Sequence, residues 1–411
     1  MHALRSIPAD LLTPLGAYLR LRGAHAGSFL LESVERGRLG RSSFMGAGSR
    51  IVDAGEAEQL DLPVVGYLAY DHVARLEPTV PLPEDGPGLP ASRFIVAETL
   101  VRFDHGAGVA EVLAGDPDEI AERLSGPLPP DEPAPRHASG PLRRFPSQER
   151  YVENVRRCQE HIRAGDAYQI VPSQRAERPT SASPLQLYRA LRRVNPSPYL
   201  FLLELGELAL VGSSPERLVA CEDGTASVCP IAGTTSPDEG DVERLLSSEK
   251  DRAEHVMLVD LGRNDLSRVC RAGTVRVTRS FEVERFSHVS HLVSEVVGEL
   301  REGITPWEVL RACFPAGTVT GAPKIRAMQI ISELEGYRRG PYAGAVGYVL
   351  PGGTMDTCIA LRTIVVSGGV AHLQAGAGVV ADSDPEAEHR ECLAKLAALE
   401  AAIDLAEAEY A

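Results

Sequence analysis

The chain lacks an apolar run long enough to cross a bilayer, which takes about 20 residues. The longest run, residues 199–203, is ended by Glu204. The first residues also reach Asp10 before any apolar stretch typical of a secretory signal develops. These absences predict a protein with no membrane partner and no secretory leader.

Paired cysteines are missing as well. The 7 cysteines are scattered singly, and no two of them form a Cys-x-x-Cys pair. An odd number at such spacing argues against both a disulfide framework and a structural zinc site. Together with the missing leader, this pattern predicts a cytoplasmic location.

Basic residues are in deficit, with 42 Lys and Arg against 57 Asp and Glu and a formal net charge of −15. Neutralisation of phosphates supplies most of the affinity for nucleic acid, so we predict no nucleic-acid partner. An anionic small molecule would need local arginines, backbone amides or a metal cation to offset the field of the whole protein.

What is present is the composition of a globular protein, 44% hydrophobic and 24% charged over 411 residues. Segments with strand and helix patterns, separated by Gly and Asp turns typical of antiparallel hairpins, predict an α+β fold. The proline-rich stretch 125–146 predicts a linker between an N-terminal portion, 1–124, and a main portion, 147–411.

Capping residues mark the helices predicted in the main portion. Ser147 is a favourable N-cap for a helix that ends at Gly165, and Pro323 suits the first turn of one that ends at Gly336. Apolar stripes predict two more helices, over about 248–261 and from 385 to near the C-terminus.

Two glycine-rich segments resemble nucleotide-binding motifs without meeting their requirements. Residues 376–381 fit G-x-G-x-x-A, but no helix pattern begins at the glycines. In residues 317–324 the lysine does not directly follow the second glycine. The amides of such turns, and of the turn at Gly233, can cradle a carboxylate, and ordinary turn geometry is the alternative explanation.

Glu254 and Glu391 fall on two separate predicted helices. Carboxylates from two helices can hold a hard cation such as Mg²⁺, while the alternative is acidic residues stabilised near helix N-termini. His288 and His291 lie on opposite faces of one strand-like run, and either is a candidate acid or base. Spacing alone does not decide these questions.

Long motifs in a fixed order resemble the chorismate-utilising enzymes, most closely the anthranilate synthase component I family. They cover nearly all of residues 150–400, and further matches lie in the N-terminal portion; the motifs include 12–19, 29–33, 65–71, 168–175, 253–265, 314–324 and 374–378. The resemblance implies two stacked antiparallel β-sheets flanked by helices, with the active site in the cleft between them.

The resemblance also implies an activity. Chorismate and ammonia would be converted to anthranilate and pyruvate, the first step of tryptophan biosynthesis. A separate glutamine amidotransferase subunit would supply the ammonia, because no glutaminase segment is recognisable in the 411 residues.

By the same resemblance, individual residues acquire roles. Mg²⁺ would be held by Glu254 and Glu391. Catalysis would fall to Glu216 as general acid, His291 rather than His288, and Thr318. The implied substrate-binding set is Gln169, Gly233, Thr234, Thr235, Tyr342, Arg362, Gly376, Ala377 and Gly378. Tryptophan, as feedback inhibitor, would be bound by Ser33, Pro198, Tyr199 and Leu200, for which an ordinary buried strand is the alternative.

Four positions bear on the choice of subfamily. Ala232 stands where aminodeoxychorismate synthases commonly carry lysine, and Gln169 where water-using isochorismate and salicylate synthases place a lysine base. Both favour ammonia as the attacking group. Thr235 replaces an arginine usual in the family, and Leu200 a methionine. The alternatives are 2-amino-2-deoxyisochorismate synthase, aminodeoxychorismate synthase and a non-catalytic ligand-sensing homologue.

Overall fold

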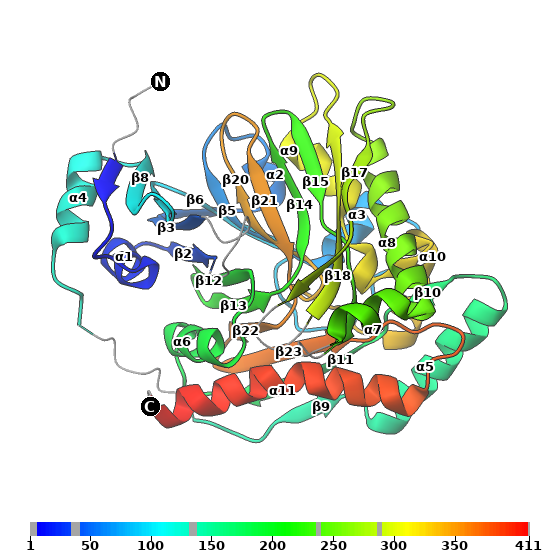
Figure 1. The fold of residues 1–411 in the computed structure, drawn as a ribbon. Coiled ribbons are helices and arrows are strands. Elements are labelled where there is room, and N and C mark those ends of the chain that lie inside the picture. The colour runs from blue at the N-terminus through cyan, green and yellow to red at the C-terminus, as the bar shows by residue number, and fades with distance from the viewer. Residues whose placement is uncertain (1–5, 34–41, 131–137, 236–239, 286–289, 410–411) are drawn as a thin grey trace.

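A computed structural model describes residues 6–33, 42–130, 138–235, 240–285 and 290–409 (Figure 1). Its framework is two large antiparallel sheets that stack face to face, with helices on both outer faces. The α+β architecture predicted from the sequence is confirmed.

The first sheet has 11 strands in the order β1-β8-β7-β3-β2-β12-β13-β22-β23-β11-β9. Its strands are β1 (Ser6–Pro8), β2 (Gly27–Glu32), β3 (Ser42–Gly48), β7 (Thr99–Asp104), β8 (Val109–Ala114), β9 (Arg143–Phe145), β11 (Ser173–Pro179), β12 (Tyr199–Leu205), β13 (Leu208–Ser214), β22 (Thr363–Ser367) and β23 (Val370–Gly376).

The second sheet has 10 strands in the order β16-β18-β15-β14-β21-β20-β5-β6-β4, with β17 paired to β18. Its strands are β4 (Arg50–Val52), β5 (Val64–Leu68), β6 (Ser92–Val96), β14 (Arg217–Glu222), β15 (Thr225–Val228), β16 (Ile231–Thr235), β17 (Arg276–Arg285), β18 (Ser290–Glu299), β20 (Ala345–Val349) and β21 (Met355–Ile359). A separate pair joins β10 (Gln169–Ile170) to β19 (Gly321–Ala322).

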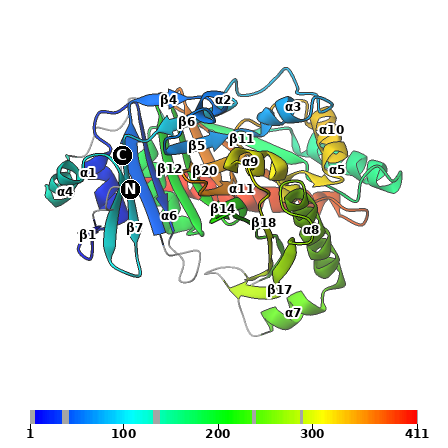
Figure 2. The same ribbon diagram turned by 90° about the horizontal axis from the view of Figure 1, so that it is seen from above.

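Helices cover the outer face of each sheet. The first sheet packs against α1 (Pro14–Leu21), α4 (Pro117–Ser125), α6 (Pro184–Val194) and α11 (Pro385–Glu409). The second packs against α2 (Ala54–Ala57), α3 (Val73–Leu76), α8 (Glu249–Ser267) and α9 (Pro306–Cys313). The remaining helical segments are α5 (Gln148–Arg163), α7 (Asp241–Ser247), α10 (Lys324–Glu335), η2 (Tyr70–His72) and η3 (Gly317–Val319). Figure 2 shows α1 and α4 at one end of the molecule and α8, α10 and α5 at the other.

Side chains that alternate between the two faces of a strand contribute to the core on both sides of the sheet. Phe29 of β2 and Leu210 of β13 face Val65 and Ile95 of the second sheet. Leu30, the next residue of β2, faces the helices of the first sheet instead. Successive side chains of a strand point to opposite faces, so a strand covered on both sides is apolar throughout.

The helix ends lie where the capping residues predict them. The Ser147 hydroxyl accepts a hydrogen bond from Arg150 N at 3.4 Å at the start of α5. Pro323 precedes α10, and Gly336 ends it with a φ of 68°, a left-handed conformation that suits glycine. The helix predicted over 248–261 extends further, to Ser267.

Both portions of the chain contribute to both sheets. Strand β2 of the N-terminal portion pairs with β12, and β5 pairs with β20. The predicted linker 125–146 includes β9, which pairs with β11. The two portions therefore build the same two sheets together.

All seven cysteines lie in the described ranges, where they are buried and unpaired. This agrees with the prediction that the chain has no disulfide framework. Among the described helices, none combines the length and the apolar character needed to cross a membrane.

Candidate active site

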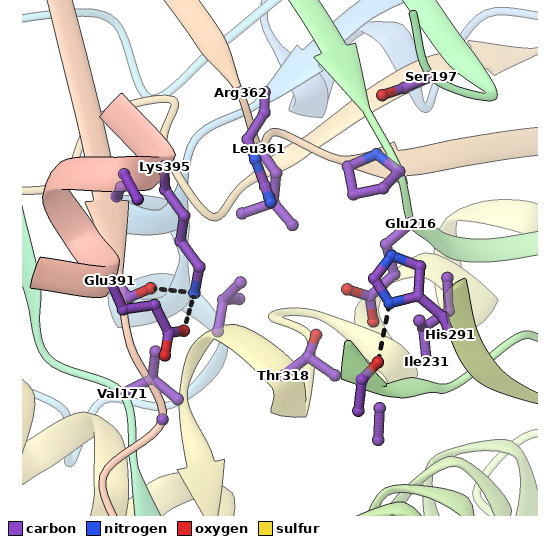
Figure 3. A pocket seen from close by; sticks show the side chains of 18 of the residues that line it. Val171, Ser197, Glu216, Ile231, His291, Thr318, Leu361, Arg362, Glu391 and Lys395 are labelled. Carbon is purple, nitrogen blue, oxygen red and sulfur yellow. Dashed lines mark hydrogen bonds and ion pairs between the residues drawn. The ribbon is translucent and has the colours of Figure 1, made fainter. Parts of the chain in front are cut away.

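A cavity of about 750 Å³ opens between the two sheets at the end where α8 and α11 approach them. Figure 3 shows Glu391 and Lys395 of α11 on one side and Glu216, His291 and Thr318 on the other. The walls come from segments that are distant in sequence, so the fold rather than any single motif assembles the site.

Glu216 follows β13 and is buried in the wall of the cavity, 8% exposed. Burial raises the pKa of its carboxyl from 4.5 to about 8, against the opposing effects of the Thr318 hydroxyl, Arg362 and Lys395. The Thr318 hydroxyl lies beside Glu216, but its geometry is not that of a normal hydrogen bond, and its buried Oγ1 has no partner in the described part of the chain. Glu216 is therefore a protonated acid at neutral pH.

Arg362 directs its guanidinium into the cavity from the segment before β22 (Figure 3). No carboxylate of the described residues lies within ion-pair distance of it, although Glu216 and Glu391 are close enough to affect its pKa. Its φ of 45° is unusual for a residue with a side chain, and such strain clusters at functional sites. An arginine without a carboxylate partner in such a cavity is suited to bind an anionic ligand.

His291, on β18, has a pKa lowered by burial, so its ring is neutral at neutral pH. Its Nδ1 lies 2.8 Å from the carbonyl oxygen of Gly233 and must carry the proton to donate this bond. In that tautomer Nε2 is the basic nitrogen of the ring. Gly233 itself has a φ of 66°, which brings its carbonyl to the histidine in a conformation that favours glycine.

Acidic side chains line the opposite wall. The Gln169 side-chain amide donates to Glu254 Oε1 at 2.8 Å, and the buried Gln169 Oε1 has no partner within the described residues. Lys395 Nζ lies 2.7 Å from Glu391 Oε1 and 2.8 Å from the carbonyl oxygen of Gly376. Glu388 lines the same wall.

Two glycines leave no room for a side chain on this wall. A Cβ on Gly378 would lie 2.7 Å from Gln169 Nε2. One on Gly376 would lie 2.8 Å from the carbonyl oxygen of Pro172 and 2.9 Å from the hydroxyl of Tyr342. At Gly376 a backbone oxygen therefore excludes a side chain, whereas at Gly378 the Gln169 side chain would have to move.

The fold brings most of the predicted residues to one place. The cavity is lined by Gln169, Pro198, Glu216, Gly233, Glu254, His291, Thr318, Tyr342, Arg362, Gly376, Gly378 and Glu391.

Other predicted residues lie elsewhere. The Ala377 side chain is in the apolar core, and its amide donates to the Pro172 carbonyl at 3.3 Å. Thr235 pairs with Ser290 and is not part of the cavity lining, as is also true of Ser33, Tyr199 and Leu200. The side chain of Thr234 and all of His288 lie outside the described part of the chain.

The sequence analysis assigned no role to several cavity residues, among them the charged residues Asp251, Glu388 and Lys395. Glu388 and Lys395 share one face of α11 with Glu391, at spacings of three and four residues. Side chains so spaced on a helix are neighbours, so the charge pattern around Glu391 contained the signal.

A cavity of this kind, with a protonated carboxyl, a neutral histidine and an unpaired guanidinium, defines a site that binds and transforms a small organic anion. The chain belongs to the chorismate binding enzyme family, whose profile matches residues 37–401.

Relatives match over nearly their whole length. Anthranilate synthase component 1 of Thermus thermophilus is 46% identical, with 97% of this chain and 97% of that protein covered. The protein of the same name from Pseudomonas aeruginosa is 42% identical, with 97% and 94% covered.

Solved structures of other proteins have the same fold. The crystal structure of anthranilate synthase component I from Streptococcus pneumoniae matches with a TM-score of 0.78 and 34% identity, covering 97% of this chain and 100% of that one. The menaquinone-specific isochorismate synthase of Escherichia coli shares the fold, with a TM-score of 0.76, 22% identity, and 98% and 95% of the two chains covered.

The raised pKa of Glu216 makes the stability of the protein depend on pH. The folded state keeps a proton that the unfolded chain loses above its ordinary pKa, so this stabilising contribution is present in full below about 4.5 and is lost as the pH rises through about 8. We expect the parent chain to lose stability relative to Glu216→Gln as the pH rises across this window. Urea unfolding of both proteins at several pH values measures the difference, and a difference independent of pH would contradict the burial argument.

Proposed function

We propose that this chain is the synthase subunit of an anthranilate synthase, which converts chorismate and ammonia to anthranilate and pyruvate. The observation that carries the proposal is the 46% identity to anthranilate synthase component 1 of Thermus thermophilus over 97% of both chains. The chemistry of the cavity agrees with this reaction step by step.

The first step needs an acid at the hydroxyl that departs from C4 of chorismate. Hydroxide is a poor leaving group, and a proton from a positioned acid turns it into water. Glu216 has a pKa of about 8 and holds that proton at neutral pH. Ammonia then adds at C2, and Thr318 beside Glu216 offers a hydroxyl to the reacting groups.

Chorismate carries two carboxylates, and the cavity offers them different partners. The guanidinium of Arg362 suits bidentate recognition of one carboxylate, and the Tyr342 hydroxyl and the turn at Gly376 and Gly378 lie in the same lining. In the second step, loss of pyruvate with aromatisation, neutral His291 would assist proton transfer.

Glu254 and Glu391 would hold a Mg²⁺ ion, which when bound supplies positive charge to a substrate carboxylate. The donor set fits this ion: carboxylate oxygens are hard ligands, and Mg²⁺ commonly takes one or two of them with waters and substrate oxygens. Within the described ranges no group of three or more His, Cys, Asp or Glu side chains is placed to hold a metal unaided, so water and substrate oxygens would have to complete the site. Lys395 Nζ is paired with Oε1 of Glu391, so Mg²⁺ would compete with the Lys395 ammonium for this oxygen.

Ammonia would come from a separate glutamine amidotransferase subunit in the cytoplasm. The relatives are named component 1, which supports a second component. Seven buried thiols without disulfides suit a reducing compartment.

Tryptophan would act as feedback inhibitor at the predicted segments. They are neighbours, because Leu200 of β12 pairs with Glu32 of β2, directly before Ser33. The Tyr199 hydroxyl accepts a hydrogen bond from Arg217 Nε at 2.9 Å, and Arg217 adjoins the acid Glu216. The proposed inhibitor site is thus connected to the catalytic acid Glu216 through Tyr199 and Arg217.

The product of the purified chain tests the proposed function. Incubated with chorismate, Mg²⁺ and ammonium at mildly alkaline pH, the parent is expected to release fluorescent anthranilate and equimolar pyruvate. Loss of the acid in Glu216→Gln is expected to lower kcat by about 10²–10⁴-fold. An aminated product that keeps its enolpyruvyl group would favour 2-amino-2-deoxyisochorismate or aminodeoxychorismate synthase instead, and absence of turnover would favour a ligand-sensing homologue.

Substitution of one carboxylate tests the metal site. Glu254→Ala is expected to keep its fold by circular dichroism but to lose more activity than the about 10–100-fold typical of an outer-shell partner. Calorimetric titration with Mg²⁺ is expected to show the matching loss of binding. Glu400→Ala serves as control, since Glu400 of α11 pairs with Arg144 at the surface. Unchanged activity and Mg²⁺ affinity in Glu254→Ala would refute the assignment.

Inhibition by tryptophan is tested with Ser33→Leu, whose larger side chain would crowd the proposed inhibitor position next to β12. We expect the tryptophan concentration for half-inhibition to rise about tenfold or more, equivalent to ~1.4 kcal/mol, with activity retained. Ser139→Leu, at an exposed serine, is the matched control. A parent chain whose activity is insensitive to tryptophan would contradict the proposal.

A further inference from the structure

Arg339 lies between α10 and β20 and is only 3% exposed. A guanidinium cannot lose its proton at physiological pH, and a buried charge is costly unless it is paired and hydrogen-bonded. The contacts of Arg339 therefore show what its burial serves.

Glu335, the last residue of α10, pairs with Arg339 through two parallel hydrogen bonds. Nε donates to Oε2 at 2.9 Å and Nη2 to Oε1 at 2.6 Å, and both side chains are 1% exposed. Such a bidentate pair fixes the plane of the guanidinium as well as its position.

The remaining donors of Arg339 reach the backbone of two segments in the cavity wall. Nη2 donates to the Val171 carbonyl at 2.7 Å and Nη1 to the Val319 carbonyl at 2.8 Å. Val171 and Val319 both line the cavity, and Val319 belongs to the turn η3 that carries Thr318.

Aromatic rings cover the guanidinium. Its carbon lies 4.7 Å from the centre of the Tyr70 ring and 5.6 Å from that of Tyr342. Tyr342 is the third cavity residue in contact with Arg339, after Val171 and Val319. One guanidinium thus joins three wall segments that are far apart in sequence.

Glu335 extends the network to a fourth segment. Its Oε1 accepts hydrogen bonds from Ser173 N and Ser173 Oγ, both at 2.7 Å. Ser173 Oγ in turn accepts one from the Gln374 side-chain amide at 2.8 Å, and Gln374 lines the cavity. Neither Arg339 nor Glu335 lines the cavity itself.

We propose that the buried Arg339–Glu335 pair is a positioning unit for the reaction, holding Tyr342, the Thr318 turn and the Val171 segment in the geometry that substrate binding and proton transfer require. The inference rests on the proposed function for the identity of the reaction. It assigns to the pair a role that is neither contact with substrate nor general stability.

Lysine cannot replace the arginine in this role. Its ammonium is a single point charge on a flexible stem and cannot direct four hydrogen bonds along fixed axes as the planar guanidinium does. Arg339→Lys keeps the charge and removes the geometry, so it separates positioning from charge balance.

The test compares Arg339→Lys with Arg178→Lys. Arg178 is also held by carboxylates, in its case Asp404 and Glu407, but it contacts α11 away from the cavity lining. At a temperature where both variants are folded by circular dichroism, kcat/KM of Arg339→Lys for chorismate is expected to fall about 100-fold, with kcat lowered and KM raised, as misplacement of reacting groups by about 1 Å can cause. Arg178→Lys is expected to stay within about twofold of the parent, as for contacts remote from the reacting groups.

Chemical rescue provides the second readout. Added guanidinium is expected to restore activity to Arg339→Ala in a saturable manner, whereas the same concentration of potassium chloride does not. A merely structural role would leave kcat and KM of the folded Arg339→Lys protein unchanged, and that result, or failure of rescue in a folded Arg339→Ala, would overturn the inference.

The product made by the parent reports separately on the proposed function. The ratio of kcat/KM of the variant to that of the parent, measured for the same product, reports on the positioning unit. If the parent makes a different aminated product, the proposed function fails, while the ratio still tests the role of the pair.

Discussion

The site depends on how negative charge is balanced in the central cavity. Glutamates line one wall, and a single guanidinium, that of Arg362, faces them without a carboxylate partner within ion-pair distance in the described residues. The whole chain carries a formal net charge of −15. A dianionic substrate can enter such a place only if its charge is offset locally, and burial of Glu216 in protonated form removes one negative charge that would oppose it.

The stacked sheets make this arrangement possible. A core such as that between Phe29 and Ile95 fixes the distance between the sheets, so groups at their edges meet across a space of defined shape. Glu216 follows a strand of one sheet and His291 lies on a strand of the other. Arg339 and Glu335, below the lining, tie several of the wall segments together. The chemistry therefore depends on contacts that no substrate touches.

The ends of helices α5 and α10 could be predicted from the sequence alone. Ser147, Pro323 and Gly336 mark helix ends because capping involves only neighbouring residues. Glu254 and Glu391 are different. Spacing along the chain favoured a surface role for each of them, and the resemblance to a family was needed to pair them. The structure places both in one cavity because α8 and α11 approach it from the two sheets.

The residues that could not be predicted depend on distant backbone. Arg339 bonds to the carbonyl oxygens of Val171 and Val319, and a carbonyl has no residue type to recognise in a sequence. The pKa of Glu216 likewise follows from burial by the surrounding fold rather than from its neighbours in the chain. Lys395 was within reach of prediction, since it lies four residues after Glu391 on the same helix.

The most direct test of how charge is balanced in the cavity is whether Mg²⁺ and chorismate increase each other's binding affinity. If Glu254, Glu391 and a substrate carboxylate share one ion, each ligand must tighten the other by the same factor, because coupling between two binding sites is reciprocal. Calorimetric titration of Mg²⁺ into the protein without ammonium, with and without chorismate, measures this factor. The account predicts a clear tightening of Mg²⁺ by chorismate and an equal tightening of chorismate by Mg²⁺. Equal Mg²⁺ affinity in the two titrations would contradict it.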